Sequence, residues 1–146
     1  MRKKKIKMNY KVIAKYIKDL KFEISNPKTF FLLEKNISNY KINIDIKSKQ
    51  FKDKIIEVET TLALNPNNND LDKINTKIVF ATIIEIGDEL TNKKDLEEVI
   101  LIHVPTKIYP EMRNLFILLF EKSGFNKVKI EENVNFKELY LKRSIQ

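Results

Sequence analysis

Apolar and polar residues alternate in four stretches of this sequence, and no other feature restricts the possible fold as strongly. The stretches are Ile17–Ile24, Lys41–Lys49, Ile55–Leu64 and Lys73–Ile86. A period of two residues is typical of strands that bury one face, and successive strands with short links favour an antiparallel sheet. The fourth stretch carries Val79, Ala81 and Ile83 on its second face, so we expect that face to be partly covered.

The last third of the chain changes to a helical pattern. Residues 110–124 predict a helix that starts at Pro110 and ends at Gly124 in a left-handed conformation. Residues 135–143 predict a second helix with Asn135 as its N-cap. The predicted fold class is therefore α+β, a four-stranded antiparallel sheet with a long helix and a shorter C-terminal helix.

Three segments give weaker patterns. Tyr10–Tyr16 is expected to form one or two helical turns before the first strand. Residues 95–104 are expected to form either a short helix or an apolar crossover segment. The apolar run Phe30–Leu33, in a loop, is expected to cover some other apolar surface.

The ends of the chain are expected to be tails around a single domain. Residues 1–8 are basic, residues 9–141 hold the predicted elements, and residues 142–146 follow the second helix. The basic start has no apolar segment behind it, which argues against a secretory signal peptide. No apolar run approaches the roughly 18 residues of a transmembrane helix, so no membrane insertion is expected.

Six consecutive apolar residues lie within the predicted long helix: Leu115, Phe116, Ile117, Leu118, Leu119 and Phe120. Such a run surrounds a helix completely, whereas a helix on one face of a sheet needs only an apolar stripe. We therefore expect a second subunit to cover this helix, with an interface formed by Leu115, Phe116, Leu118, Leu119 and Phe120. The alternative is that Phe30–Leu33 folds over it.

Residue types that carry catalysis are scarce. The chain has one histidine, His103, within an apolar segment, and it has no cysteine. Its two glycines, Gly87 and Gly124, cannot supply a phosphate-binding loop, and no His or Cys spacing suggests zinc. The adjacent carboxylates Glu97–Glu98 and Glu131–Glu132 are typical of solvated surface charge. The sequence therefore indicates a binding protein that is not an enzyme and uses no cofactor or metal.

A net charge of +8 also fits a Lys-rich nucleic-acid-binding domain. Of the 28 basic residues, however, only Arg2, Arg113 and Arg143 are arginines, the residue type that reads guanine edges and clamps phosphates. Lysine, asparagine and isoleucine are abundant together, which is typical of codon bias in an AT-rich genome. Nucleic-acid binding is therefore the lesser hypothesis, and the basic residues 1–8 are expected to be a solvated tail.

Three blocks of the sequence resemble the SecB family of protein-export chaperones. YIKDLKFEISNP, residues 16–27, is similar to that family's first strand, with the pattern aromatic-x-K-D-hydrophobic-x-F-E-x-x-N-x. HVPTKIYPEMR, residues 103–113, resembles the segment P-x-x-(I/L)-(F/Y)-P-x-x-R that leads into its long helix. SGF and, ten residues after Phe125, NFKELY resemble its closing pattern G-F…V-(N/D)-F-x-x-L-(Y/F). The blocks keep the family's order over residues 10–141.

The resemblance implies a SecB-like chaperone domain over residues 9–141 that assembles as a dimer of dimers. It implies a cytoplasmic holdase that binds unfolded precursor proteins, keeps them translocation-competent and delivers them to the SecA motor. In the family SecA docks on an acidic sheet face, and Asp19 and Glu23 occupy two of those acidic positions by motif. The strand pattern points Glu57 and Glu59 outward as well, so these four residues are the expected SecA-docking face.

The groove that holds clients is expected near the crossover between the sheet and its helices. A holdase accepts many sequences, and aromatic side chains offer a large apolar area at small entropic cost. The candidate lining residues flank the two predicted helices: Ile108, Tyr109, Phe125, Val128, Phe136 and Tyr140. For Phe125 and Phe136 the alternative is that they only attach the last helix to the sheet.

Four features depart from the family pattern. The family is usually acidic whereas this chain is at +8, and the chain stops soon after Arg143 without the family's acidic C-terminal extension. No acid stands near Thr82, where a third SecA contact would align, and the loop at Asn65–Asp72 is longer than usual. These departures keep a second hypothesis open, a SecB-like chaperone that partners an antitoxin in a toxin–antitoxin system.

Overall fold

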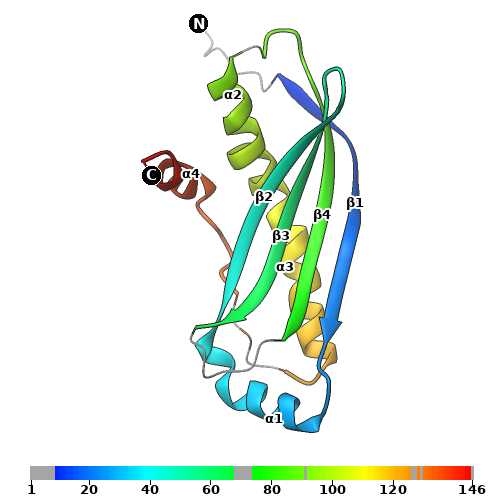
Figure 1. Cartoon of the computed structure of the whole chain (residues 1–146), viewed down its shortest axis with the longest axis vertical. Coiled ribbons are helices and arrows are strands. Elements are labelled where there is room, and N and C mark those ends of the chain that lie inside the picture. Colours follow the sequence, from blue (N-terminus) through cyan, green and yellow to red (C-terminus); the bar gives the residue numbers. More distant parts are fainter. Residues whose placement is uncertain (1–8, 68–73, 91, 126–127, 129, 146) are drawn as a thin grey trace, which may run out of the picture.

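The computed structural model describes residues 9–67, 74–90, 92–125, 128 and 130–145 and shows a sheet with helices beside it (Figure 1). The strands are β1 (Tyr10–Glu23), β2 (Tyr40–Lys52), β3 (Ile55–Pro66) and β4 (Asn75–Ile86). The helices are α1 (Pro27–Asn36), α2 (Lys93–Glu98), α3 (Val104–Lys122) and α4 (Phe136–Ile145), with a 3₁₀ turn at Ile37–Asn39 and a π-helical segment at Val99–His103. The predicted α+β class with a four-stranded antiparallel sheet is confirmed.

The strands lie in the order β1-β4-β3-β2, and every neighbouring pair is antiparallel. A tight hairpin joins β2 to β3, and within it Lys54 adopts a positive φ of 64°. β4 returns between β3 and β1, so β1 and β2 form the two edges of the sheet. The outer backbone groups of both edge strands pair with no other described strand.

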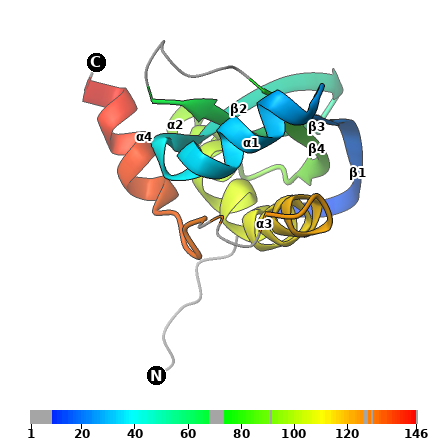
Figure 2. The ribbon, with the colours of Figure 1, turned by 90° about the horizontal axis from the view of Figure 1, so that it is seen from below.

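The sheet has two different faces. α3 runs along one of them, here called the helix face, as the two perpendicular views show (Figures 1 and 2). In β3 the apolar residues Ile56, Val58, Leu62 and Leu64 are buried on this face. Glu57 and Glu59 alternate with them and point to the opposite face, here called the open face. The predicted orientation of this strand is confirmed.

β4 is buried on both faces. Its helix-face residues lie under α3, while Val79 and Ala81 on the open face are only 6% and 0% exposed. The expectation that the second face of this strand is partly covered is therefore confirmed. In the register Ala81 lies between Tyr16 of β1 and Glu59 of β3, and side chains from those two strands provide its cover.

The first strand is longer than its sequence pattern indicates. β1 begins at Tyr10, so the expectation of helical turns at Tyr10–Tyr16 is wrong. Two irregularities interrupt its register with β4, one between Val12 and Ala14 and one between Ile17 and Asp19. Each irregularity inserts an extra residue into β1 and reverses which side chains face the helix, so the period of two is lost although the strand continues.

The long helix begins before Pro110. Residues 93–122 are helical throughout, as α2, the π-helical segment and α3. The helical alternative for residues 95–104 is therefore confirmed, and Pro110 lies inside α3, not at its first position. A proline removes one backbone hydrogen bond from a helix interior, and the buried residues Ile108 and Met112 on either side of it hold the helix against the sheet.

The ends of the last two helices follow the sequence prediction. Gly124 ends α3 with a φ of 93°. The side chain of Asn135 caps α4 by accepting a hydrogen bond from the backbone N–H of Glu138 at 2.9 Å. α4 continues to Ile145, so the residues from 142 onward that were expected to form a tail are helical up to that residue.

α1 closes the end of the sheet that lies opposite the β2–β3 hairpin (Figure 1). Asn26 caps it by accepting a hydrogen bond from the backbone N–H of Thr29 at 2.9 Å, and a proline follows at the first helical position. Leu33 is buried and Phe30 packs on Phe125 with ring centroids 4.8 Å apart. The expectation that this run lies in a loop is wrong, because it belongs to α1. The expectation that it covers another surface is confirmed for these two residues, whereas Phe31 and Leu32 are exposed.

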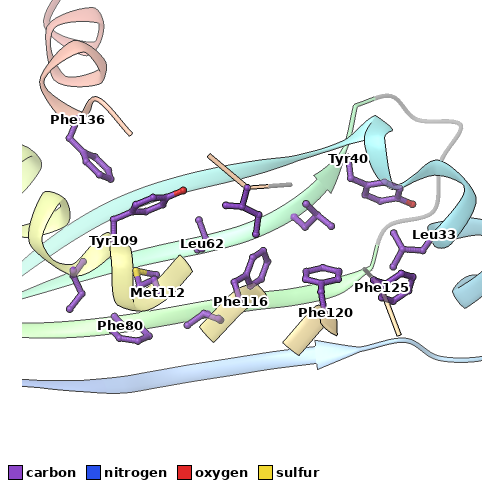
Figure 3. Close-up of a cluster of buried hydrophobic side chains, with 14 residues drawn as sticks. Leu33, Tyr40, Leu62, Phe80, Tyr109, Met112, Phe116, Phe120, Phe125 and Phe136 are labelled. Atoms are coloured by element: carbon purple, nitrogen blue, oxygen red, sulfur yellow. The ribbon is translucent and has the colours of Figure 1, made fainter. Parts of the chain in front are cut away.

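The main core lies between the helix face and α3 (Figure 3). Met112, Phe116 and Phe120 lie one helical turn apart on a single stripe of α3 and have no exposed surface. Phe120 packs edge-on against Phe22 of β1 and against Phe125, with ring centroids 4.8 Å and 5.8 Å apart. This stripe anchors the helix to the sheet.

Replacing Phe120 with alanine should lower the free energy of unfolding by about 3–5 kcal/mol, because a buried phenylalanine leaves a cavity behind. Phe31→Ala is the matched control, since Phe31 is 63% exposed and its loss should cost less than about 1 kcal/mol. Urea unfolding followed by circular dichroism measures both changes. Equal losses for the two variants would contradict the packing of α3 on the sheet.

Candidate functional site

An apolar groove of about 320 Å³ lies between β2 and the connector from α3 to α4. β2 and β3 supply its floor on the helix face, α3 supplies Tyr109, and the connector supplies the far wall. The apolar and aromatic lining residues are Ile37, Tyr40, Ile42, Ile44, Leu64, Tyr109, Val128 and Val134. A groove of this kind beside an edge strand has the shape and chemistry for an extended peptide segment.

Tyr109 fixes the connector that forms the groove wall. Its hydroxyl donates a hydrogen bond to the backbone carbonyl oxygen of Glu131 at 2.5 Å, and Arg113 Nε donates to that of Ile130 at 3.1 Å. The Tyr109 ring also packs edge-on against Phe136 of α4, with centroids 6.0 Å apart. Burial raises the pKa of Tyr109 above its ordinary value, so the hydroxyl keeps the proton that this bond requires.

Two of the predicted groove residues, Tyr109 and Val128, line this groove. The other four, Ile108, Phe125, Phe136 and Tyr140, do not line this groove and are buried, at 2–9% exposed. Helices at the surface of a sheet need their apolar side for attachment, and these residues provide it. Tyr140, for example, holds α4 to α2 through a hydrogen bond from its hydroxyl to Glu97 at 3.3 Å.

The β2 side of the groove was not predicted. Ile42 and Ile44 point to the helix face of β2 but stay half-buried. Their alternation is visible in the sequence, yet only the order of strands places β2 at an edge. A sequence pattern alone does not tell which strand lies at the edge of a sheet, and therefore which apolar residues remain accessible.

The four predicted docking carboxylates all lie on the open face. Asp19 and Glu23 belong to β1, and Glu57 and Glu59 belong to β3. They do not form one cluster, because Glu57 and Glu59 lie toward the hairpin and Glu23 lies near the opposite end of the sheet.

Lys18 of β1 reaches across β4 to the carboxylates of β3. Its Nζ lies 3.1 Å from Glu57 Oε1 and 2.5 Å from Glu59 Oε2. The hydroxyl of Tyr16 donates a hydrogen bond to Glu57 at 2.7 Å. Because β4 lies between β1 and β3, these side chains meet above Ala81, and the small alanine leaves room for them.

These contacts raise the pKa values of the donors Lys18 and Tyr16 and lower the pKa of the acceptor Glu57. The bonds to Glu59 and Glu57 raise the pKa of Lys18 to about 12. The hydrogen bond from Tyr16 lowers the pKa of Glu57, helped by the bond from Lys18, and the same bond raises the pKa of Tyr16. The groups lie near the surface, where solvent screens such pairs. Their main effect is to neutralise Glu57 and Glu59 locally.

The other two carboxylates also have partners. Asp19 lies 3.6 Å from Lys77 Nζ, and Glu23 accepts a hydrogen bond from the side chain of Asn75 at 3.3 Å. The open face is therefore balanced in charge where an acidic face was expected. Thr82, the position of the expected third contact, is 2% exposed and lies on the helix face, so it takes no part in the open face.

The apolar run of α3 divides between core and surface. Phe116 and Phe120 are fully buried within the subunit, so their assignment to a subunit interface is wrong. Leu115 and Leu119 are half-buried, and Leu118 is 46% exposed. One stripe of the run packs on the sheet, and the remainder reaches the surface of the subunit.

The exposed side of α3 adjoins an apolar edge strand. Lys15 of β1 pairs with Glu111 of α3, and Leu118 lies two helical turns further along the same side of the helix. Along this side of α3, the β1 residues Val12, Ile17 and Leu20 are 40%, 49% and 41% exposed. This side of the molecule therefore combines an unpaired strand edge with accessible apolar side chains.

No cation site is evident in the part of the chain that the structure describes. Within it, no three or more His, Cys, Asp or Glu side chains are placed to hold a metal ion. His103 lies half-buried in the π-helical segment. None of the described helices is both long enough and apolar enough to span a membrane.

The fold is that of a known class of chaperone. A SecB-like chaperone of Mycobacterium tuberculosis, solved in complex with a ChAD peptide from the HigA1 antitoxin, superposes with a TM-score of 0.63. The superposition covers 86% of this chain and 88% of that chain at 11% sequence identity. At this level of identity the similarity shows a shared fold.

Sequence relatives identify the family. A putative protein-export protein SecB from Pelagibacter ubique is 38% identical over 136 residues, which span 93% of this chain and 97% of that protein. The protein-export protein SecB of Orientia tsutsugamushi is 28% identical over 130 residues, spanning 88% and 79% of the two chains. The family model described as "Preprotein translocase subunit SecB" matches residues 3–146. The chain belongs to the SecB family of protein-export chaperones, and the resemblance seen in three sequence blocks is confirmed.

Proposed function

We propose that this chain is a cytoplasmic holdase that binds unfolded precursor proteins, keeps them translocation-competent and delivers them to the SecA motor. The observation that carries the proposal is the apolar groove beside β2, with Tyr109 and Val128 in its walls. The lining residues are apolar, aromatic or charged, which suits binding and supplies no nucleophile. The proposed activity requires neither a reaction nor a cofactor.

The groove supports binding of an extended chain in two ways. Its apolar floor and walls accept side chains of many kinds, because apolar contact is not directional. β2 is an edge strand, so its outer backbone groups are available to hydrogen-bond a client backbone whatever the client's sequence. The bonds of Tyr109 and Arg113 to the connector hold the far wall in place before a client arrives, which reduces the entropic cost of binding.

Val128→Asp should weaken the binding of an unfolded client by at least about tenfold, because a charge in the groove must lose water when an apolar client side chain docks. The affinity is measured by fluorescence titration with a slow-folding precursor, together with suppression of its aggregation. Leu141→Asp is the control, since Leu141 is 51% exposed on α4 and does not line the groove. Unchanged client affinity in Val128→Asp, with the melting temperature of the wild type, would show that the groove is not the client site.

We propose that SecA docks at the α1 end of the open face, through Asp19 and Glu23. Glu23 lies near the opposite end of the sheet from the Lys18 bridge that neutralises Glu57 and Glu59, and Asp19, the residue after Lys18, takes no part in that bridge. The pairing of Asp19 with Lys77 is long, at 3.6 Å, and both side chains are partly solvated. Such a pair contributes little stability, so Asp19 is able to exchange Lys77 for a cationic segment of a partner.

The double variant Asp19→Lys and Glu23→Lys should bind SecA at least about tenfold more weakly at low salt, because two attractive charges become repulsive. Isothermal titration calorimetry measures the affinity, and circular dichroism checks that the fold is retained. Glu132→Lys with Glu138→Lys makes the same change in net charge at exposed sites outside the open face. If both double variants bind SecA as the wild type does, the docking assignment fails.

We propose that subunits assemble as a dimer of dimers and that β1 and the exposed side of α3 meet a second subunit. The combination of an unpaired edge, exposed apolar residues on β1 and Leu118 supports this contact. Phe116 and Phe120 are excluded from it by their burial within the subunit. Long unpaired apolar edges in soluble proteins are usually covered by another element or chain.

Leu118→Glu should dissociate the assembly, because an unpaired charge buried at the interface costs several kcal/mol. The separate subunit should stay folded, because Leu118 is exposed within it. Leu139→Glu is the matched control, since Leu139 on α4 is 45% exposed and Leu118 is 46% exposed. Light scattering coupled to size exclusion measures the mass of each. A wild-type protein that is a compact monomer at micromolar concentration would refute the assembly.

The antitoxin-linked alternative has weaker support than export. It rests on a shared fold at 11% identity. A relative named as a putative protein-export protein is 38% identical over 97% of its own length. Export is therefore the function that we propose.

A further inference from the structure

A second hollow lies on the open face, on the opposite side of the sheet from the client groove. This hairpin hollow has a volume of about 670 Å³ and receives residues from all four strands beside the β2–β3 hairpin. Ile55 of β3 and Ile83 of β4 form its floor. Ile13 and Tyr16 of β1 and Phe51 of β2 form its walls. Its volume is in the range of sites that hold a side chain or a small ligand.

The walls of the hairpin hollow are unusually exposed for apolar residues. Phe51 is 71% exposed, and Ile13 and Tyr16 are 48% and 47% exposed. No described helix lies on this face (Figures 1 and 2). Contiguous apolar surface of this kind on a soluble protein marks an interaction site more often than a packing defect.

The charges around the hairpin hollow are predominantly positive. Glu57 lies within it but is already bonded to Lys18 and Tyr16. Lys49 and Lys52 also line it. Lys49 lies opposite Glu57 in the register and helps to lower the pKa of that carboxylate, but neither lysine lies within salt-bridge distance of a described carboxylate. The ammonium group of Lys52 lies 5.8 Å from the centre of the Phe51 ring, which holds positive charge at the rim of the apolar wall.

We propose that the hairpin hollow binds a segment of a partner protein in which a large apolar side chain is flanked by acidic residues. The apolar side chain contacts Ile55 and Ile83 on the floor, and the flanking carboxylates pair with Lys49 and Lys52. Charge complementarity selects this occupant, because the only carboxylate in the lining is already neutralised. A second copy packed hollow to hollow is disfavoured as the occupant, because Lys49 and Lys52 of the two copies would then face each other.

This surface is separate from the proposed SecA contact. Asp19 pairs in the register with Val79, four residues along β4 from Ile83, which corresponds to about 13 Å at the rise of a strand. The two surfaces also differ in the partner they require, since Asp19 and Glu23 need a cationic segment. The sheet face thus presents an acidic contact near α1 and a basic, apolar contact near the hairpin.

A short fluorescein-labelled peptide tests the proposal, with one phenylalanine and one leucine flanked on both sides by aspartate and glutamate. Fluorescence anisotropy with the full chain should show binding that weakens as salt is raised. Phe51→Ser, and separately Lys49→Glu with Lys52→Glu, should each weaken it at least about tenfold. The matched controls lie on α1, at the other end of the molecule: Phe31→Ser, and Lys28→Glu with Lys35→Glu, should leave the affinity unchanged.

Four outcomes would overturn the proposal. The first is equal affinity in Phe51→Ser and Phe31→Ser, both folded by circular dichroism. The second is equal binding of a peptide in which lysines replace the acidic residues. The third is loss of binding in the groove variant Val128→Asp, which would place the peptide in the client groove. The fourth is a change of oligomeric mass in Phe51→Ser, which would assign this surface to contacts between copies of the chain.

Discussion

The packing of one stripe of α3 against the helix face of the sheet is the interaction on which the other features depend. Met112, Phe116 and Phe120 are fully buried there, and each such side chain contributes about 1.5–3 kcal/mol by leaving water. Once this stripe is fixed, the other sides of the helix have fixed positions too. Tyr109 faces the connector and the apolar groove beside β2, and Leu118 faces outward beside β1. A single helix therefore positions both the groove wall and the proposed subunit contact.

Much of the fold was predictable because its signals are local. The alternation in β3 sets Glu57 and Glu59 on the open face, and Gly124 and Asn135 mark helix ends through backbone geometry and capping that their own chemistry dictates. β1 was recognised only in part, because its register irregularities arise from pairing with β4. The start of the long helix was missed for a related reason: burial of the residues around Pro110 outweighs the local preference of proline for a helix start.

The candidate site was less predictable than the fold. Whether an apolar residue lines a groove or fills the core depends on which elements pack beside it. Tyr109 and Val128 were predicted to line a groove and do so, whereas Phe136 and Tyr140 attach α4 to the rest of the chain. The apolar run of α3 shows the same limit. Its composition predicts that part of it stays uncovered, but only the direction of the helix on the sheet assigns Phe116 to the core and Leu118 to the surface.

Because β4 is covered on both faces, residues 78–84 form an uncharged run, Ile-Val-Phe-Ala-Thr-Ile-Ile. A run of this composition is prone to cross-β aggregation when it is exposed. During synthesis the N-terminal part of a chain emerges first, so β1 and β3, the two strands that flank β4, leave the ribosome before it. A member of a chaperone family thus contains an aggregation-prone segment of its own, and its strand order lets both neighbours pair with that segment as soon as it emerges.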